Sequence, residues 1–415
     1  MLLYIKGIEN CGETIKRIAI VCKFPIGKRI LAPERYLYET AELFSKMGMK
    51  VEFFVISGRT ATSRINNKYK QNEFGITKIS EYGFSLGRVF DLLCLMIFGF
   101  RPTYEIANRR ISLLKALDYY DPNYVIVWDF GLSKLIEKYR FGRYGKPGII
   151  FLGDSERIIY SNLDSVINIF GGAGVFASWV KRMLKGNYIK YNLNYYKRQI
   201  KIADALVVPS VEAANHLSAR HNMLKGKVYS ISPQYIRKIS KRRFKISYRI
   251  TNVLFLGSLP FRPNAEAIDI IYKDIAPKLP DKTFIIVGRG VPKKTEGNVK
   301  FVGEVADINK EIEGADICIA PMKSTSGRKT KVFDYFANGK AVLGTSIAFQ
   351  GYNVRCGLNA IVEDNTRDFA SKIKWLERNR RTFIRIQKNA FGVVREFEET
   401  NVAIKWKNLL NSITK

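Results

Sequence analysis

The sequence contains few of the residues that build metal and redox sites. Its 415 residues include only two histidines and five cysteines. The cysteines are scattered without a Cys-x-x-Cys pair, and Cys22 and Cys318 fall in apolar runs where a small buried hydrophobe is expected. We therefore expect no bound metal and a protein with reduced cysteines, as in the cytosol.

Acidic residues are scarce relative to basic ones. There are 37 Asp and Glu against 69 Lys and Arg, which gives a formal net charge of +32. Such an excess predicts a polyanionic partner, such as a nucleotide, an anionic membrane surface or nucleic acid. The interleaving of aromatic and basic residues that is typical of nucleic-acid motifs is not evident, so nucleic acid is not the expected partner.

Long hydrophobic runs are also missing. Phe90–Phe100 is apolar apart from Asp91, whereas a spanning helix needs about 20 residues. Residues 165–180 carry no charge and precede three basic residues, an arrangement suited to docking on anionic lipid or, alternatively, a core segment before a solvated helix. Polar and charged residues occur throughout 1–17, unlike in a secretory signal. The expected location is cytoplasmic, peripheral on the inner face of the cell membrane.

Short apolar runs alternate with helical stretches along the chain, which predicts buried parallel strands joined by helices. The expected strands are 17–23, 51–56, 124–128, 148–152, 205–208 and 227–231, then 253–256, 283–287, 299–302, 316–320, 341–343 and 360–362. A helix starting at Pro33 and another over 264–275 fit this order. The pattern predicts an α/β protein with two Rossmann-like, doubly wound parallel-sheet domains that bind ligand at the carboxyl edges of their strands.

A basic segment separates the two series. Residues 233–249 carry seven Lys and Arg without an acid, and the strand–helix order begins again at Asn252. About 230 residues already complete a doubly wound domain. We therefore expect domains over 1–235 and 236–400, followed by a final helix over 401–415.

The stretch Pro321–Val342 has the order strand end, loop, helix and strand that is typical of an anion site. A polar loop precedes a helix that closes at Asn338-Gly339, expected to be a left-handed cap pair. Free backbone N–H groups and the helix dipole attract anions to such a helix N-terminus.

The charges of this stretch indicate what the anion is. Arg328, Lys329 and Lys331 lie in the first turn of the helix, where cations are unfavourable unless a strongly negative ligand such as a diphosphate is bound. One turn on, Asp334 is placed to bind neutral hydroxyls, such as those of a ribose. The alternative is a solvated basic loop before an ordinary helix.

Several passages of the second half resemble successive motifs of one family. They are Val253–Asn264, Phe284–Gly290, Phe301–Asp307, Ala315–Pro321 and Gly327–Gly339. Their order is that of the group 1 glycosyltransferases, a class of retaining enzymes with two domains facing a cleft, the GT-B fold. In the first half, residues 149–156 and 202–213 are similar more loosely. The region of Trp406 resembles the last helix of the family, which packs back on the N-terminal domain.

The resemblance implies that a UDP- or GDP-linked sugar binds to the second domain, with no cofactor, and that a glycan or lipid-linked saccharide acceptor binds to the first. Gly257 would begin the loop under the diphosphate, with Arg262 as the nearest cation. Arg289, Gly303 and Glu304 would border the base. Gly327, Arg328, Lys329, Thr330 and Lys331 would hold the phosphates, and Asp334 would take the place of the ribose-binding glutamate. Asp154 would orient the acceptor hydroxyl or the sugar.

Two departures from the family pattern concern the sugar. Ser326 stands eight residues before Asp334, where the family usually has a glutamate that contacts the donor sugar. Gly153 stands beside Asp154, where a histidine is common. A branch of the family with the pattern G-T-R-x-K-V-x-E-A-x-A-x-G also lacks that first glutamate and is classed as a transferase.

Many glycosyltransferases neutralise the leaving diphosphate with a metal held by Asp-x-Asp, a motif that this sequence lacks. The expected reaction is therefore metal-independent, with the helix N-terminus and the side chains of Arg262 and Lys331 stabilising the departing charge and Asp154 in the reaction centre. Two alternatives remain. One is a GT-B nucleotide-sugar epimerase, which the histidine-poor first half disfavours. The other is a non-catalytic basic protein that binds polyanions or membranes, which the basic segment and the missing glutamate favour.

Overall fold

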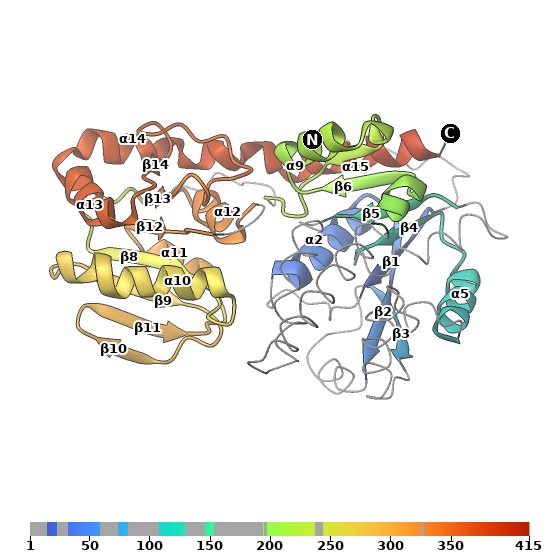
Figure 1. Ribbon diagram of the computed structural model, residues 1–415, viewed down its shortest axis with the longest axis horizontal. Helices are drawn as coiled ribbons and strands as arrows, with labels where there is room; N and C mark the ends of the chain where they lie inside the picture. The colour runs from blue at the N-terminus through green and yellow to red at the C-terminus, as the bar shows by residue number, and fades with distance from the viewer. Residues whose placement is uncertain are drawn as a thin grey trace, which may run out of the picture. The chain divides into compact units, whose positions relative to one another are not determined.

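The computed structural model describes residues 15–22, 32–58, 74–81, 108–128, 146–152, 194, 197–236, 244–324 and 328–414. The chain folds as two compact units, residues 1–234 with 403–415 and residues 235–402, and each contains one seven-stranded sheet (Figure 1). The apolar segments 90–100 and 165–180, the part of the basic segment over 237–243, Asp154 and Gly327 lie outside the described residues.

The first unit has the strand order β3-β2-β1-β4-β5-β6-β7, and every pairing is parallel. The strands are β1 (Arg17–Cys22), β2 (Lys50–Gly58), β3 (Gly75–Glu81), β4 (Tyr124–Val127), β5 (Gly148–Phe151), β6 (Ala205–Val208) and β7 (Val228–Ser230), and the helices include α2 (Ala32–Lys46), α5 (Asn108–Tyr120) and α9 (Val211–Arg220). The predicted strands are confirmed, but β3 was missed. It is an edge strand whose polar residues interrupt the apolar run that marks a strand covered on both faces.

Helix α15 (Glu399–Ile413) ends in the first unit. The buried Trp406 packs edge-on against Phe44 of α2, with ring centroids 4.9 Å apart. The hydroxyl groups of Tyr124 and Thr414 lie 2.8 Å apart, within hydrogen-bond distance. One aromatic contact and one polar contact therefore fix the end of the chain on this unit.

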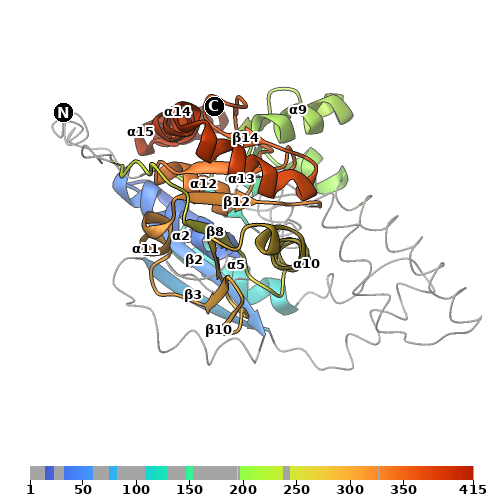
Figure 2. The same ribbon diagram turned by 90° about the vertical axis from the view of Figure 1, so that its left-hand side faces the viewer.

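The second unit has the strand order β10-β11-β9-β8-β12-β13-β14. Its strands are β8 (Asn252–Leu256), β9 (Thr283–Val287), β10 (Lys294–Glu296), β11 (Val299–Gly303), β12 (Ile317–Ala320), β13 (Ala341–Gly344) and β14 (Ile361–Val362), and its helical segments include α10 (Arg262–Ile270), α11 (Ile308–Gly314), α12 (Thr330–Ala337), α13 (Phe369–Arg378), α14 (Arg380–Ala390) and η8 (Phe391–Phe397). Helices α10 and α11 lie on opposite faces of the sheet (Figure 2). The prediction of a doubly wound sheet in each half is confirmed. The short antiparallel β10, which is polar, was missed.

Two local predictions in the second unit need correction. The helix expected over 264–275 begins at Arg262, because Pro263 fits a first helical turn, and it becomes a π-helix at Ile271–Ile275. Of the expected cap pair, only Gly339 is left-handed, with φ 66°, whereas Asn338 has φ −98°. A Cβ at Gly339 would lie 2.4 Å from the ring of Phe244, so this position needs glycine for space as well.

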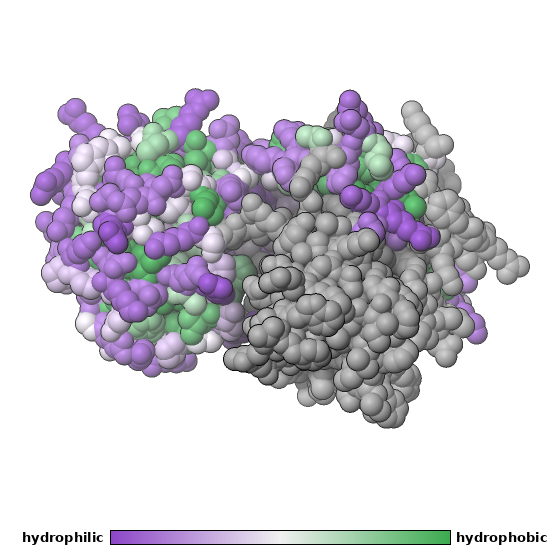
Figure 3. All heavy atoms as spheres, viewed as in Figure 1, coloured by the Kyte–Doolittle hydropathy of each residue, from purple (hydrophilic) through white to green (hydrophobic). Residues whose placement is uncertain are grey.

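Buried strands and one face of each helix form the core of the second unit. All four residues of β12 are buried, as are Val332, Phe333 and Phe336 of α12. On the face shown in Figure 3, hydrophilic side chains cover most of the described surface and hydrophobic ones are scattered among them. Among the described residues, no helix combines the length and the apolar character that crossing a bilayer requires.

Candidate active site

The strand order of the second unit reverses beside β8, where β9 lies on one side and β12 on the other. Ligands of doubly wound sheets bind outside the carboxyl ends of the strands at such a point. The loop that begins at Gly257 follows β8, and the loop that leads into α12 follows β12. The two stretches singled out in the sequence therefore meet at the switch point of this sheet.

Lys331 joins these two loops. Its ammonium group donates a 2.7 Å hydrogen bond to Oδ1 of Asn264 in α10 and lies 4.0 Å from the centroid of the Phe255 ring of β8. Asn264 in turn donates to the carbonyl oxygen of Ser258 at 3.0 Å. Although the residue as a whole keeps some exposure, burial of the ammonium and then the charge of Lys329 hold the pKa of Lys331 well below its usual range.

The structure gives Lys331 no acidic partner among the described residues. Its contacts are an amide oxygen, an aromatic face and, more weakly, the sulfur of Met322 at 3.8 Å. A buried cation that lacks a counter-charge is costly by itself. Lys331 is therefore a candidate to receive an anion at this edge of the sheet.

Backbone hydrogen bonds hold the adjacent loops together at this edge. Gly257 N–H donates to Val287, Leu259 N–H to the carbonyl of Arg289, and Gly288 N–H to Gly303. The backbones of Gly257 and Gly288 approach so closely that a Cβ at Gly288 would lie 2.0 Å from the Gly257 carbonyl oxygen. The close approach of the two backbones therefore requires glycine at position 288.

Residues of α12 and the next loop fix the start of the helix. The hydroxyl group of the buried Tyr335 accepts from Leu256 N–H at 2.7 Å, and that of Tyr352 donates to the carbonyl oxygen of Lys329 at 2.7 Å. The Lys329 ammonium donates to Oε1 of Gln350 at 3.4 Å. Because Lys329 caps the helix without a side-chain acceptor, the N-terminus of α12 keeps the polarity that attracts an anion.

Arg328 is held apart from Lys331, in an aromatic cluster. Its guanidinium carbon lies 4.2 Å from the ring centroid of Phe397, 5.7 Å from that of Tyr352 and 5.8 Å from that of Phe333. The residue is 8% exposed. Cation–π contacts of this kind hold the Arg328 guanidinium against the aromatic rings of its own unit.

The structure places the other predicted residues around this edge, with different degrees of exposure. Arg262 is 87% exposed in its side chain and pairs with Glu266 at 2.9 Å, and Glu266 also accepts from the Ser324 hydroxyl. Arg289 and Glu304 are exposed, Thr330 is partly exposed, and Gly303 and Asp334 are buried. Gly303 has φ 84°, a conformation that favours glycine.

Several residues of this arrangement were not predicted from the sequence, among them Asn264, the hydrogen-bond partner of Lys331. Tyr335 and Tyr352 look like core aromatics, and Gln350 lies in a loop far along the chain from Lys329. Their polar contacts depend on tertiary structure. There was one local indication, for Tyr335, which directly follows the predicted site residue Asp334. Among the described residues, no group of three or more His, Cys, Asp and Glu is arranged to hold a metal ion.

Comparison with known proteins agrees with this geometry. The family model described as "Glycosyl transferases group 1" matches residues 250–379, which contain the whole of the edge described above. A search of curated protein sequences finds no match.

Solved structures share the fold of the whole chain at low sequence identity. Anabaena HepE in complex with UDP-glucose is 12% identical, with a TM-score of 0.63 over 95% of this chain and 99% of that one. The pneumococcal O-GlcNAc transferase GtfA in complex with UDP and GlcNAc is 11% identical, with a TM-score of 0.65, and the match covers 97% of this chain and 100% of that one. A mutant of S. aureus TarM, in complex with Fondaparinux, alpha-GlcNAc-glycerol and UDP, is 10% identical, with a TM-score of 0.66, and the match covers 96% of this chain and 100% of that one. The second unit therefore matches the group 1 glycosyltransferase family over residues 250–379, and the whole chain, with its two doubly wound sheets, has the GT-B fold.

Proposed function

We propose that the enzyme transfers a sugar from UDP to a glycan or lipid-linked saccharide, with retention of configuration and without a metal ion. The observation that carries this proposal is the side chain of Lys331 in the first turn of α12, whose Nζ bonds to Asn264 of α10 and lies over the Phe255 ring of β8 without an acidic partner among the described residues. UDP is favoured over GDP because HepE, GtfA and TarM were solved with UDP or a UDP-sugar. The net charge of +32 supports an acceptor held at the anionic inner face of the cell membrane.

The chemistry of this site follows from charge. Glycosyl transfer builds positive charge on the sugar ring and negative charge on the departing diphosphate. A pre-positioned ammonium and backbone N–H groups stabilise that developing charge without reorganising during the reaction. Lys331 and the first turn of α12 supply these groups, Lys329 adds charge beside them, and Asp334 is assigned to the ribose. Asp154, outside the described residues, remains the candidate that orients the acceptor or the sugar.

Ligand-induced stabilisation tests the donor. We expect UDP at about 100 times its dissociation constant to add about 2.7 kcal/mol to the free energy of unfolding, because it binds only the folded protein. The stabilisation should persist in EDTA and should be weaker with GDP. Unfolding is followed by fluorescence at increasing ligand concentration. Stabilisation that requires Mg²⁺ or Mn²⁺ would contradict metal independence. In a separate assay with the UDP-sugar, release of UDP only when an acceptor is present would exclude the epimerase.

The lowered pKa of Lys331 predicts that UDP binding takes up a proton. A diphosphate beside the ammonium raises its pKa again, so the complex binds more protons than the free protein and affinity falls as pH rises through the free-state pKa. For the same reason, the free energy of unfolding of the free protein rises with pH up to the ordinary lysine pKa, because the unfolded state binds the extra proton.

Calorimetry measures this uptake. Titrations of UDP over a range of pH in two buffers with different ionisation enthalpies should give different apparent enthalpies wherever the complex binds more protons than the free protein. The difference should disappear in Lys331→Met. Equal enthalpies in both buffers for the unmodified protein would show that Lys331 does not change its protonation.

A further inference from the structure

The outer face of α14 and η8 carries a row of basic side chains, which we call the basic stripe. It consists of Arg381, Arg385, Lys388 and Arg395. Arg381, Arg385 and Lys388 follow one another at α-helical spacing in α14, and Arg395 lies further along in the 3-10 segment η8. All four are exposed, whereas Phe383, Ile386 and Ala390 on the other side of α14 are buried. The helix therefore presents a continuous cationic edge to solvent.

The charge of the basic stripe is not compensated within the described part of the protein. None of its four residues forms an ion pair with a described residue. The first turn of α14 contains no acid, and its N-cap residue Asn379 makes no side-chain cap. Like charges at i and i+4, and cations near a helix N-terminus, are both unfavourable. The stripe therefore has the composition of a surface that receives an anion.

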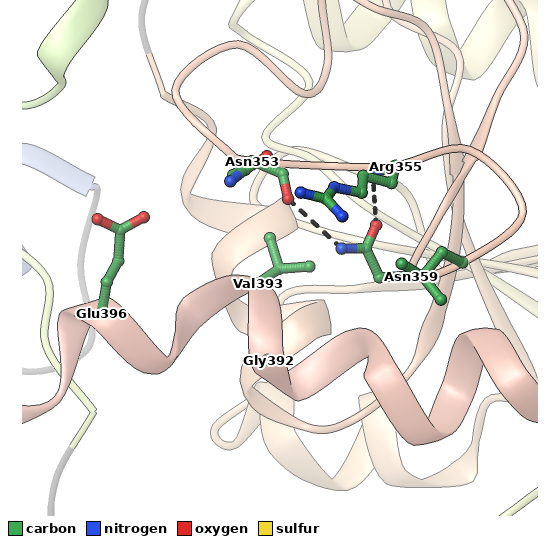
Figure 4. A pocket seen from close by; sticks show the side chains of 7 residues that line it. Asn353, Arg355, Asn359, Gly392, Val393 and Glu396 are labelled. Carbon is green, nitrogen blue, oxygen red and sulfur yellow. Dashed lines mark hydrogen bonds between the residues drawn. The ribbon is translucent and has the colours of Figure 1, made fainter.

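A hollow of about 470 Å³ adjoins the stripe (Figure 4). It is lined by Asn353, Arg355, Leu358, Asn359, Gly392, Val393 and Glu396. Gly392 lies in the stripe between Lys388 and Arg395, and a Cβ there would meet no atom within 4 Å. At this position no side chain stands between the hollow and solvent.

The facing wall of the hollow is a loop with its own fixed structure. Arg355 N–H donates to Oδ1 of Asn359 at 2.7 Å, and Nε of Arg385, in the stripe, donates to the carbonyl oxygen of Gly357 at 3.1 Å. The Arg355 side chain makes no ion pair with a described residue, and Figure 4 shows the one carboxylate of the hollow, Glu396, standing apart from it. The hollow thus combines a guanidinium, amides and the exposed Leu358 with one carboxylate, that of Glu396.

We propose that the basic stripe and this hollow bind a linear acidic glycan, with one sugar in the hollow and its acidic groups along the stripe. The proposal rests on the proposed function, because such a chain would be the acceptor or its extension. A row of cations along about 20 Å of helix matches a linear polyanion. The amides and Arg355 suit hydroxyl and acidic groups, and Leu358 suits the C–H face of a sugar. No large hydrophobic side chain of α14 or η8 is exposed to enter lipid.

The test compares two triple variants of the full-length protein. Arg381→Gln, Lys388→Gln and Arg395→Gln remove three charges of the stripe but keep Arg385, which holds the loop. Lys273→Gln, Lys300→Gln and Lys310→Gln remove three exposed charges elsewhere on the second unit. Binding to a heparin oligosaccharide, to neutral dextran and to vesicles of phosphatidylcholine with phosphatidylglycerol is measured at two salt concentrations, together with stabilisation by UDP.

The stripe variant should lose about tenfold or more in heparin affinity. Its binding should also depend less on salt, because fewer cations contact the polyanion and fewer counterions are released on binding. The control variant should lose less than about twofold, and dextran should bind to neither. Unchanged heparin binding in the stripe variant would overturn the proposal, as would a loss confined to the vesicles. UDP stabilisation should be the same in all three proteins. If UDP fails to stabilise any of them, the donor assignment fails while the heparin comparison still decides the role of the stripe.

Discussion

Replacing Lys331 with methionine should lower kcat/KM for the nucleotide sugar by about 100-fold or more, since one pre-positioned donor to a departing anion contributes that much. The variant should still fold. Methionine keeps the length of the side chain and removes a buried ammonium whose one strong hydrogen bond to a described residue is that to Asn264. The free energy of unfolding is therefore expected to stay within about 1 kcal/mol of the original. Steady-state kinetics and chemical denaturation measure the two effects separately.

Lys340 provides the matched control for this experiment. It is a buried lysine of the same unit, 3% exposed, and burial also lowers its pKa. Its ammonium donates to the carbonyl oxygens of Glu313 and Ala315, at 2.9 and 2.6 Å, which end helix α11. Lys340→Met should cost about 1–3 kcal/mol of stability, because buried carbonyls lose their donor, and should leave UDP affinity unchanged. Equal losses of UDP affinity in both variants would contradict a direct contact between Lys331 and the donor.

Replacing Gly288 with alanine should destabilise the second unit by about 3 kcal/mol or more and abolish UDP binding at ordinary temperature. The added Cβ would lie 2.0 Å from the carbonyl oxygen of Gly257 and 2.5 Å from its carbonyl carbon. Both are backbone atoms, so neither can rotate away. The Gly257 loop would have to move, and the backbone proposed to lie under the diphosphate would move with it.

Gly314→Ala controls for this prediction. Gly314 ends helix α11, has no neighbouring atom within 4 Å of an added Cβ, and has no positive φ. Its replacement should change the free energy of unfolding by less than about 0.5 kcal/mol. Thermal unfolding of both variants makes the comparison. If Gly288→Ala unfolds like the original protein, the close approach of the two loops does not exist in solution.

Much of the fold was predictable because its signals are local. Parallel strands covered on both faces appear as short apolar runs, and all twelve expected runs correspond to strands. The strands that were missed, β3 and β10, lie at sheet edges, where polar residues are tolerated. The candidate site was predicted from Pro321–Val342 because a loop, a helix N-terminus and clustered cations are also local features.

The partners of those cations could not be read from the chain in the same way. Asn264 lies 67 residues from Lys331, and its hydrogen bond exists only because β8 and β12 are neighbours in the sheet. Arg328 looked equivalent to Lys331 in the sequence, yet Phe397, a residue near the end of the second unit, holds it in an aromatic cluster. Spacing predicts which residues share a turn, whereas tertiary packing decides which of them face a ligand.

A crystal structure of the protein grown with UDP and EDTA would test the central claim most directly. We expect the two phosphate groups between the Gly257 loop and α12, with oxygen atoms within about 3 Å of Nζ of Lys331 and of N–H groups in the first turn of the helix. A diphosphate bound elsewhere on the chain, or one that binds only when a divalent cation bridges its oxygens, would contradict the account.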